Sequence, residues 1–242
     1  MTRDGRDGSA CDLPRCSAGD DVMIYAGDCR EMASMIPDHS VDLIFADPPY
    51  LREFLPLYEW LSHEAVRALK PEGFLMVYSG DYHKNTVMRW MDEQLEYFWD
   101  FTSLNTSLGL MNWQRRVICK DKSILCYRLK GSKALPRTNV LSAWYGGVRD
   151  KRYHVWQQDE STARYYIECF SKPGDLIYDP FVGGGTTPYV CKLLGRRFVG
   201  FEIDAKQADI ARARVAGARQ LEFEIISQSE IQKTLDLSER LP

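Results

Sequence analysis

The chain has 242 residues, of which 45% are hydrophobic and 27% are charged. These proportions are typical of globular proteins, so they exclude a wholly disordered or fibrous chain. No apolar run approaches the roughly 18–20 residues that a membrane-spanning helix needs, and the seven cysteines include no CxxC pair. We therefore expect a cytoplasmic protein with reduced thiols and no structural zinc or other metal. Residues 1–21 are rich in Gly, Asp, Arg and Ser and are predicted to form a flexible tail, not a secretory signal.

The formal net charge of −3 argues by itself against a nucleic-acid partner. The distribution of charge argues the other way, because residues 112–154 hold eleven Lys and Arg residues against two acids. This stretch has a net charge of +9, and the rest of the chain has −12. Both a solvated basic face and a nucleic-acid surface fit such a stretch, in which Trp144, Tyr145 and Tyr153 could stack on bases. The candidate nucleic-acid contacts are Arg115, Arg116, Lys133, Arg137, Arg149, Lys151 and Arg152.

The hydrophobic pattern predicts alternating strands and helices along the chain. In chain order these are a strand over 22–25, a helix over 30–36, a strand over 41–46, a helix over 57–69, a turn at 71–73, a strand over 74–78, a helix over 85–95, strands over 97–104 and 123–129, a helix over 163–170, a strand over 176–178, a helix over 189–194, a strand over 197–201, a helix over 205–218 and a strand over 221–226. This alternation predicts an α/β, Rossmann-like three-layer fold with a mainly parallel sheet. Ligands bind such sheets at the carboxyl ends of the strands.

A glycine-rich turn, Asp179–Thr187 (DPFVGGGTT), follows one predicted strand and precedes a helix. Three adjacent glycines let a ligand approach the backbone closely. Glu202 lies 17 residues beyond Gly185, near the position from which an acid binds ribose hydroxyls in dinucleotide folds. A tight turn without a ligand is the alternative, in which Thr186 and Thr187 would only cap the helix. A kinase-type phosphate loop is disfavoured because no Gly-Lys-Ser/Thr follows.

A second turn, Asp47-Pro48-Pro49-Tyr50, directly follows the apolar run at 41–46. The two prolines remove two backbone donors, so the turn offers carbonyl and carboxylate acceptors beside an aromatic ring. A planar guest that carries an amino group suits this arrangement: Asp47 and the Pro48 carbonyl would each accept one amino hydrogen, and Tyr50 would stack. The alternative is a rigid end to the strand with an exposed tyrosine.

Together these segments resemble the DNA amino-methyltransferases that use S-adenosylmethionine. DPPY resembles their catalytic motif, DPFVGGGTT their cofactor loop, and Gly200–Asp204 (GFEID) their ribose-binding strand end. The catalytic motif comes first, which is the order of the permuted β group, and residues 27–50, 70–80 and 171–187 match the segments of that group. The resemblance covers about residues 22–130 and 154–215. It implies one methyltransferase domain over 22–242, with a circularly permuted sheet and a basic target-recognition insertion at about 130–153.

The resemblance also implies roles for individual residues. Asp47, Pro48, Pro49 and Tyr50 would form the catalytic turn and hold the target amino group. Phe181, Gly183 and Gly185 would line the methionine part of the cofactor, Glu202 would bind the ribose and Asp28 would meet the adenine part. The other residues expected at the cofactor are Asp47, Asp179, Thr186, Thr187 and Ile203. The substrate would be DNA with a flipped base in a restriction–modification setting, without a metal, and a homodimer stays open.

Four functions remain as alternatives. Asp at the head of the tetrapeptide favours adenine N6 methylation over cytosine N4 methylation, in which Ser is more usual. RNA or protein glutamine as the substrate ranks lower, because the motif order is permuted. A catalytically decayed nucleic-acid-binding module is the fourth. It is motivated by residues 154–159 (HVWQQD), where the family's common His-Pro-x-Gln-Lys-Pro segment lacks its lysine and both prolines.

Overall fold

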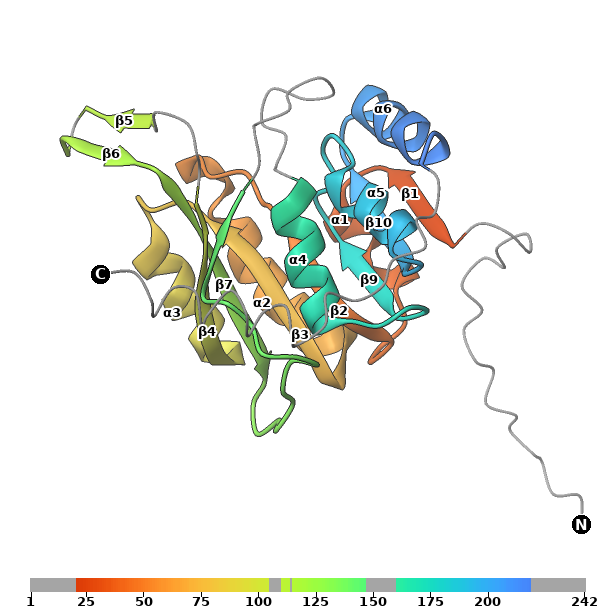
Figure 1. The fold of residues 1–242 in the computed structure, drawn as a ribbon, viewed down its shortest axis with the longest axis horizontal. Helices are drawn as coiled ribbons and strands as arrows, with labels where there is room; N and C mark the ends of the chain where they lie inside the picture. Colours follow the sequence, from red (N-terminus) through yellow and green to blue (C-terminus); the bar gives the residue numbers. More distant parts are fainter. Residues whose placement is uncertain (1–20, 105–109, 114, 147–159, 219–242) are drawn as a thin grey trace, which may run out of the picture.

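The computed structural model describes residues 21–104, 110–113, 115–146 and 160–218. Within them lies an eight-stranded sheet in the spatial order β1-β10-β9-β2-β3-β7-β4-β8 (Figure 1). These strands are β1 (Val22–Ala26), β2 (Val41–Ala46), β3 (Leu69–Ser79), β4 (Leu95–Leu104), β7 (Asp121–Leu129), β8 (Ala143–Tyr145), β9 (Leu176–Asp179) and β10 (Arg197–Glu202). A separate two-stranded sheet pairs β5 (Leu110–Asn112) with β6 (Val117–Cys119).

The five strands from β1 to β3 in the spatial order are parallel to one another, and β7 is antiparallel to both of its neighbours, β3 and β4. The short strand β8 pairs parallel with the end of β4. The predicted mainly parallel α/β sheet is therefore confirmed. Because the five parallel strands run in the same direction, the loops after β1, β2, β3, β9 and β10 all lie at one edge of the sheet.

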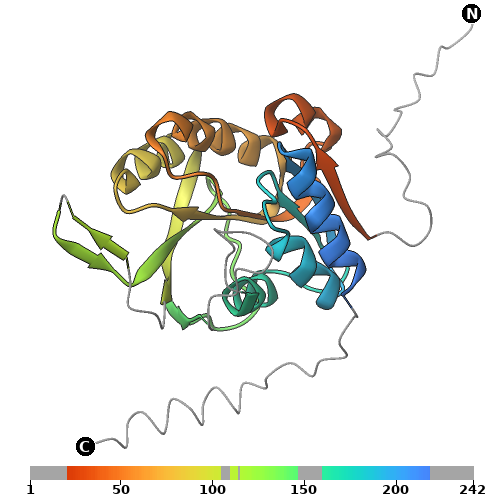
Figure 2. The ribbon, with the colours of Figure 1, turned by 90° about the horizontal axis from the view of Figure 1, so that it is seen from above.

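Helices cover both faces of this sheet, so the fold has three layers (Figure 2). One face carries α2 (Pro56–Ala68) and α3 (Lys84–Gln94), with α1 (Cys29–Met32) beside them; the other carries α4 (Glu160–Phe170), α5 (Thr186–Leu193) and α6 (Ala205–Ala216). Along β2, Leu43 and Phe45 belong to one core cluster and Ile44 and Ala46 to the other. The continuous apolar run at 41–46 is thus a strand buried on both faces, as predicted.

Several local predictions need correction. The predicted turn at Pro71–Gly73 lies inside β3, where the register with β2 shifts between the pairs Val41–Leu69 and Leu43–Phe74. A bulge accommodates a proline and a glycine that a regular ladder would exclude. The predicted helix at 30–36 is split into α1 and the 3-10 turn Ala33–Met35, and a further 3-10 turn spans Arg52–Phe54. The short strands β5, β6 and β8 were not predicted.

Some predictions concern residues that the structure does not describe. The strand at 221–226 and the tail at 1–20 lie outside the described residues. Asp21, the last residue of the predicted tail, is described, and its carbonyl accepts a hydrogen bond of 2.7 Å from the Phe198 amide. Among the helices of the described ranges, none combines the length and apolar character that crossing a bilayer requires.

Candidate active site

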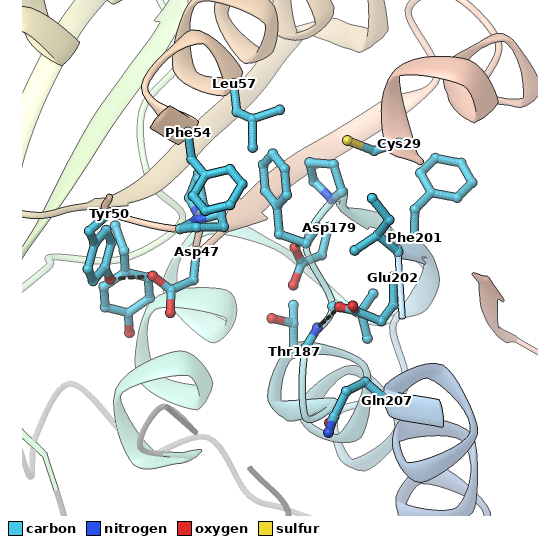
Figure 3. Close-up of a pocket in the computed structure, with 18 of the residues that line it drawn as sticks. Cys29, Asp47, Tyr50, Phe54, Leu57, Asp179, Thr187, Phe201, Glu202 and Gln207 are labelled. Atoms are coloured by element: carbon cyan, nitrogen blue, oxygen red, sulfur yellow. Dashed lines mark hydrogen bonds between the residues drawn. The ribbon is translucent and has the colours of Figure 1, made fainter. Parts of the chain in front are cut away.

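A cavity of about 750 Å³ lies at the edge of the sheet where the parallel strands end (Figure 3). The turn after β2, the glycine-rich loop after β9 and the ends of β1 and β10 all line it. Catalytic-turn and cofactor candidates that are far apart in the sequence therefore meet in one space. Those that line the cavity are Asp28, Asp47, Pro48, Pro49, Tyr50, Asp179, Phe181, Gly183, Thr186, Thr187, Glu202 and Ile203.

The turn after β2 brings an acceptor and an aromatic ring together. The Tyr50 hydroxyl donates a hydrogen bond to the Asp47 carboxylate. Burial and the charge of Asp47 raise the pKa of Tyr50 well above its usual value, so this hydroxyl keeps its proton. The Tyr50 side chain packs against Gly80 and needs a glycine there, because a Cβ on Gly80 would lie 3.1 Å from the Cβ of Tyr50. The turn thus presents oxygen acceptors beside the ring of Tyr50, whose position is fixed by its hydrogen bond to Asp47.

Two carboxylate side chains bind backbone amides of the loop after β9. The Gly183 amide donates to Glu202 Oε2 at 2.7 Å, and the Phe181 amide donates to Asp179 Oδ1 at 2.9 Å. Gly183 and Gly185 have φ values of 51° and 78°, in the left-handed region that favours glycine. Gly185 itself N-caps α5, and Thr186 and Thr187 begin that helix, so the predicted capping role for the two threonines is wrong.

The end of β10 places an acid and an apolar residue at the rim of the cavity. Glu202 Oε1 accepts a hydrogen bond of 3.0 Å from the Asp204 amide, so both oxygens of this carboxylate are oriented by backbone amides. Ile203 is exposed at the rim. Asp28, after the neighbouring strand β1, caps α1 and binds Arg30 at 2.6 Å, and this pair lowers the pKa of Asp28.

Asp179 is buried at the end of β9, and burial raises its pKa to about 7. The folded protein therefore holds this proton more tightly than the unfolded chain does. Consequently the free energy of unfolding falls as pH rises from about 4 to about 7, by about 1.4 kcal/mol per pH unit at most, and levels off above this range.

We expect Asp179→Asn to remove this part of the pH dependence. Urea unfolding of both proteins at pH 5, 6, 7 and 8 measures it: relative to the wild type, the variant should gain stability steadily up to pH 7. A constant difference across this range would show that Asp179 does not titrate there.

Arg214 on α6 binds the backbone of the glycine-rich loop. This role of Arg214 was not predicted from the sequence. Its guanidinium, with 2% of the side chain exposed, donates to the Gly184 carbonyl at 2.7 Å and pairs with Glu160 at 2.5 Å. The sequence carries a signal for it, because Ala208, Ala211 and Val215 mark the buried face of this helix and Arg214 falls on the same face. A cation in a core position needs a partner, and here the partners are the loop and α4.

We expect Arg214→Met to lower the free energy of unfolding by about 2 kcal/mol, because the Gly184 carbonyl loses a charged donor in a buried place. Arg89→Met, at an exposed position of α3, is the matched control and should change stability by less than about 0.5 kcal/mol. Equal effects of the two changes in urea unfolding would show that the loop does not depend on Arg214.

Lys122 is a second residue that sequence reasoning missed as part of the site. Its ammonium lies 5.3 Å from the ring centroid of Tyr50 and 5.8 Å from that of Tyr78, and the side chain lines the cavity. No local pattern marks it. Only the pairing of β7 with β3 and β4 brings it there.

The predicted nucleic-acid cations are not gathered in one place. Arg115 and Arg116 directly precede β6, and Arg115 lies over the ring of Tyr82 in the loop after β3. Lys133 follows the end of β7, at the edge of the sheet opposite the cavity, since Ser132 donates to the Pro71 carbonyl at the start of β3. Arg137 donates to the Ser171 carbonyl before β9, at the same far edge. Arg149, Lys151 and Arg152 lie outside the described residues, as do Tyr153 and the 154–159 segment.

The two described aromatics of the basic stretch also differ from each other. Trp144 stacks on Tyr165 of α4, with ring centroids 3.9 Å apart, so this ring is used in packing. Tyr145 is 75% exposed and stays available as a contact.

The segments that line this cavity match a known protein family. The family model described as "DNA methylase" matches residues 41–213, which include both turns and Glu202. The chain belongs to the DNA methylase family. This family includes both adenine-N6 and cytosine-N4 enzymes.

Two relatives are type II methyltransferases. The chain is 28% identical to M.BamHI of Bacillus amyloliquefaciens over 243 aligned positions, which cover 74% of this chain but 54% of the relative. It is 30% identical to M.HinfI of Haemophilus influenzae over 246 positions, covering 79% of this chain and 67% of the relative. The chain thus spans about half to two thirds of the length of these relatives.

Solved structures share the fold of this DNA methylase family member. The M1.HpyAVI–SAM complex matches with a TM-score of 0.67 at 21% identity, covering 80% of this chain and 98% of that one. The PvuII DNA methyltransferase, described as cytosine-N4-specific, matches with a TM-score of 0.69 at 18% identity, covering 90% and 95%.

Proposed function

We propose that the chain transfers a methyl group from S-adenosylmethionine to the N6 amino group of adenine in DNA, with the target base flipped out of the duplex. The observation that carries this proposal is the shared cavity. The acceptor-rich turn at Asp47–Tyr50 faces the same space as the glycine loop and Glu202. A methyl donor and an amino acceptor can then be held against each other.

The residues of the cavity fit the proposed cofactor. Gly183 lines the cavity and leaves its backbone open to a ligand. Gly185, which was expected at the methionine part of the cofactor, is not among the lining residues: a Cβ on it would lie 2.9 Å from that of Ala211, so this glycine lets the loop pack closely against α6. Glu202 presents a carboxylate for ribose hydroxyls, held in place by the Gly183 amide. Phe181 and the other apolar side chains of the lining supply a surface for the rest of the molecule. When bound, S-adenosylmethionine supplies an electrophilic methyl group, so no metal is needed for the transfer.

The chain's own residues would position the amino group. Tyr50 would stack on the flipped base, which offsets part of the cost of unstacking it. Asp47 and the Pro48 carbonyl would accept the two amino hydrogens, and the base would share the Asp47 carboxylate with the Tyr50 hydroxyl. These hydrogen bonds orient the nitrogen lone pair toward the methyl group, so catalysis consists mainly of alignment. The nitrogen–carbon bond forms as the sulfur–methyl bond breaks, S-adenosylhomocysteine is the leaving group, and the methylated nitrogen then passes one proton to the Asp47 carboxylate and on to water.

The same proposal includes the organisation of the chain. Because the Asp47–Tyr50 turn precedes the Asp179–Thr187 loop, we assign the protein to the permuted β group. We keep residues 1–21 as a tail, 22–242 as the methyltransferase domain and 130–153 as the target-recognition insertion. The free cysteines of the described residues fit action in the reducing cytoplasm, and a homodimer remains part of the proposal to be tested.

Cytosine N4 methylation is the second candidate, favoured by one observation: a solved structure with the same fold is described as cytosine-N4-specific. Adenine ranks first because Asp47, in place of Ser, heads the tetrapeptide.

One experiment separates these possibilities. The protein is incubated with labelled S-adenosylmethionine and mixed-sequence DNA, in single- and double-stranded forms, and the DNA is digested to nucleosides for mass spectrometry. Asp47→Ala is the control. N6-methyladenine that disappears in the control supports the proposal, and N4-methylcytosine promotes the second candidate. Cofactor binding without a methylated nucleoside points to RNA or protein substrates. No cofactor binding favours a decayed nucleic-acid-binding module.

A further inference from the structure

The β5–β6 ribbon extends from the body of the protein (Figures 1 and 2). Among the strands that the structure describes, these two pair with each other alone, through Leu110–Cys119, Met111–Ile118 and Asn112–Val117. Large apolar side chains on it face solvent: Trp113 is 81% exposed and Ile118 59%, and Met111 and Val117 are also exposed. A two-stranded ribbon cannot bury such side chains by itself, so this concentration of exposed apolar surface indicates a partner.

The charge of the ribbon indicates what kind of partner covers it. Exposed cations follow the apolar residues at Arg115, Arg116 and Lys120, and Lys122 lies at the start of β7. The acids near them are Asp121 and Asp81, the second of which lies beside Cys119. Cations that surround exposed apolar and aromatic side chains complement a polyanion whose interior consists of stacked rings.

The ribbon adjoins the catalytic turn, with residues from both its base and its turn end. Asn112 and Cys119 line a second cavity of about 180 Å³ together with Tyr50 and Gly80. The Arg115 guanidinium lies 4.1 Å from the ring centroid of Tyr82, which follows β3 in the loop that also contains Gly80. The Arg115 amide donates to the Asn112 side chain at 3.0 Å. The Arg115–Tyr82 contact and the shared second cavity place the ribbon at the same edge of the sheet as the proposed target base.

We propose that the β5–β6 ribbon is a DNA-binding arm that lies in a groove of the duplex beside the flipped base, with Trp113 as an apolar wedge in the base stack. This inference rests on the proposed function and names how that site holds its duplex. A two-stranded ribbon fits the major groove, and apolar wedges unstack neighbouring bases in other DNA complexes. Arg115 and Arg116 neutralise phosphates, and the indole of Trp113 fills the space that the flipped base leaves.

The test compares Trp113→Ala with Trp99→Ala, which removes a half-exposed indole from β4. Duplex affinity is measured by fluorescence anisotropy, methyl transfer with mixed-sequence duplex DNA, and cofactor binding by calorimetry. We expect Trp113→Ala to weaken duplex binding and to lower kcat/KM on duplex DNA roughly 10- to 100-fold. Cofactor affinity should stay the same, and Trp99→Ala should behave like the wild type.

A second variant tests the charges. Changing Arg115 and Arg116 together to Gln should reduce the slope of log K for duplex binding against log salt by about 2, one unit for each lost phosphate contact. An unchanged slope would remove these arginines from the interface.

The outcomes distinguish this inference from the proposed function. If the wild-type protein methylates no DNA, the proposed function is wrong. A wild-type protein that methylates DNA, with Trp113→Ala indistinguishable from Trp99→Ala, overturns the DNA-binding arm alone. Loss of cofactor binding in Trp113→Ala would mean a structural role for Trp113. Conversion of a dimer to a monomer by Trp113→Ala, seen by light scattering, would mean that a second copy of the chain covers the ribbon. Both results would overturn the inference.

Discussion

Asp47→Ala is expected to lower the rate of methyl transfer by about a thousandfold or more while changing cofactor affinity by less than about tenfold. The reason is geometric: Asp47 supplies the carboxylate at the acceptor-rich turn, next to Tyr50 and away from the Glu202 end of the cavity. Without this acceptor the amino group is neither oriented nor made more nucleophilic, and alignment supplies most of the rate enhancement. Single-turnover transfer to DNA and calorimetric titration with the cofactor measure the two effects separately.

A second substitution separates shape from charge. Asp47→Asn keeps a carbonyl oxygen for the Tyr50 hydroxyl but replaces the carboxylate with an amide, so the turn should stay folded while transfer remains strongly impaired. Asp209→Asn, at an exposed position on α6 paired with Arg212, is the matched control and should retain full activity. If cofactor binding fell in parallel with transfer, Asp47 would hold the cofactor and not the target base.

Gly200→Ala is expected to lower the free energy of unfolding by about 3 kcal/mol, with a melting temperature lower by about 10 °C. A Cβ on Gly200 would lie 2.5 Å from Val182 Cγ2, 2.6 Å from the Asp179 carbonyl oxygen and 2.6 Å from Phe198 Cζ. The carbonyl belongs to the ladder between β9 and β10, where Gly200 pairs with Asp179. It cannot move away without disturbing the strand that carries the glycine-rich loop.

The same substitution at Gly217 is the matched control. Its added Cβ would meet nothing closer than 3.6 Å, and its φ of −79° suits any residue. Gly217→Ala should therefore change stability by less than about 0.5 kcal/mol. The melting temperatures of the wild type, Gly200→Ala and Gly217→Ala, measured by thermal unfolding, test this prediction. A small effect at Gly200, equal to that at Gly217, would mean that β9 and β10 can separate locally at little cost.

The secondary structure near the site was predictable because its signals are local. The apolar run of β2 ends at Asp47-Pro48, and the glycines at 183–185 directly precede α5, so residues adjacent in sequence determine where strand and helix stop. The bulge in β3 was not predictable in this way. Pro71 and Gly73 usually mark a turn, and only their position against Val41 and Asp42 of the neighbouring strand keeps them in the sheet.

The position of the basic residues shows the same limit. Lys133 and Arg137 are close in sequence to Trp144 and Tyr145, yet the two pairs lie at opposite edges of the sheet. The chain between the two pairs runs from the end of β7 to the end of β4, which lie at opposite edges. Net charge along the sequence identified the basic stretch but could not indicate which cations face the cavity.

The sequence by itself determined the α/β class, the mainly parallel sheet and the two turns that carry the candidate chemistry, because periodicity, prolines and glycines act within a few residues. The tertiary structure decided that Arg214 supports the glycine loop, that Lys122 reaches Tyr50 and that the apolar β5–β6 ribbon stands beside the cavity. These contacts join residues from about 30 to more than 70 positions apart. They depend on strand order, register and the packing of helices against the sheet, which no local pattern encodes.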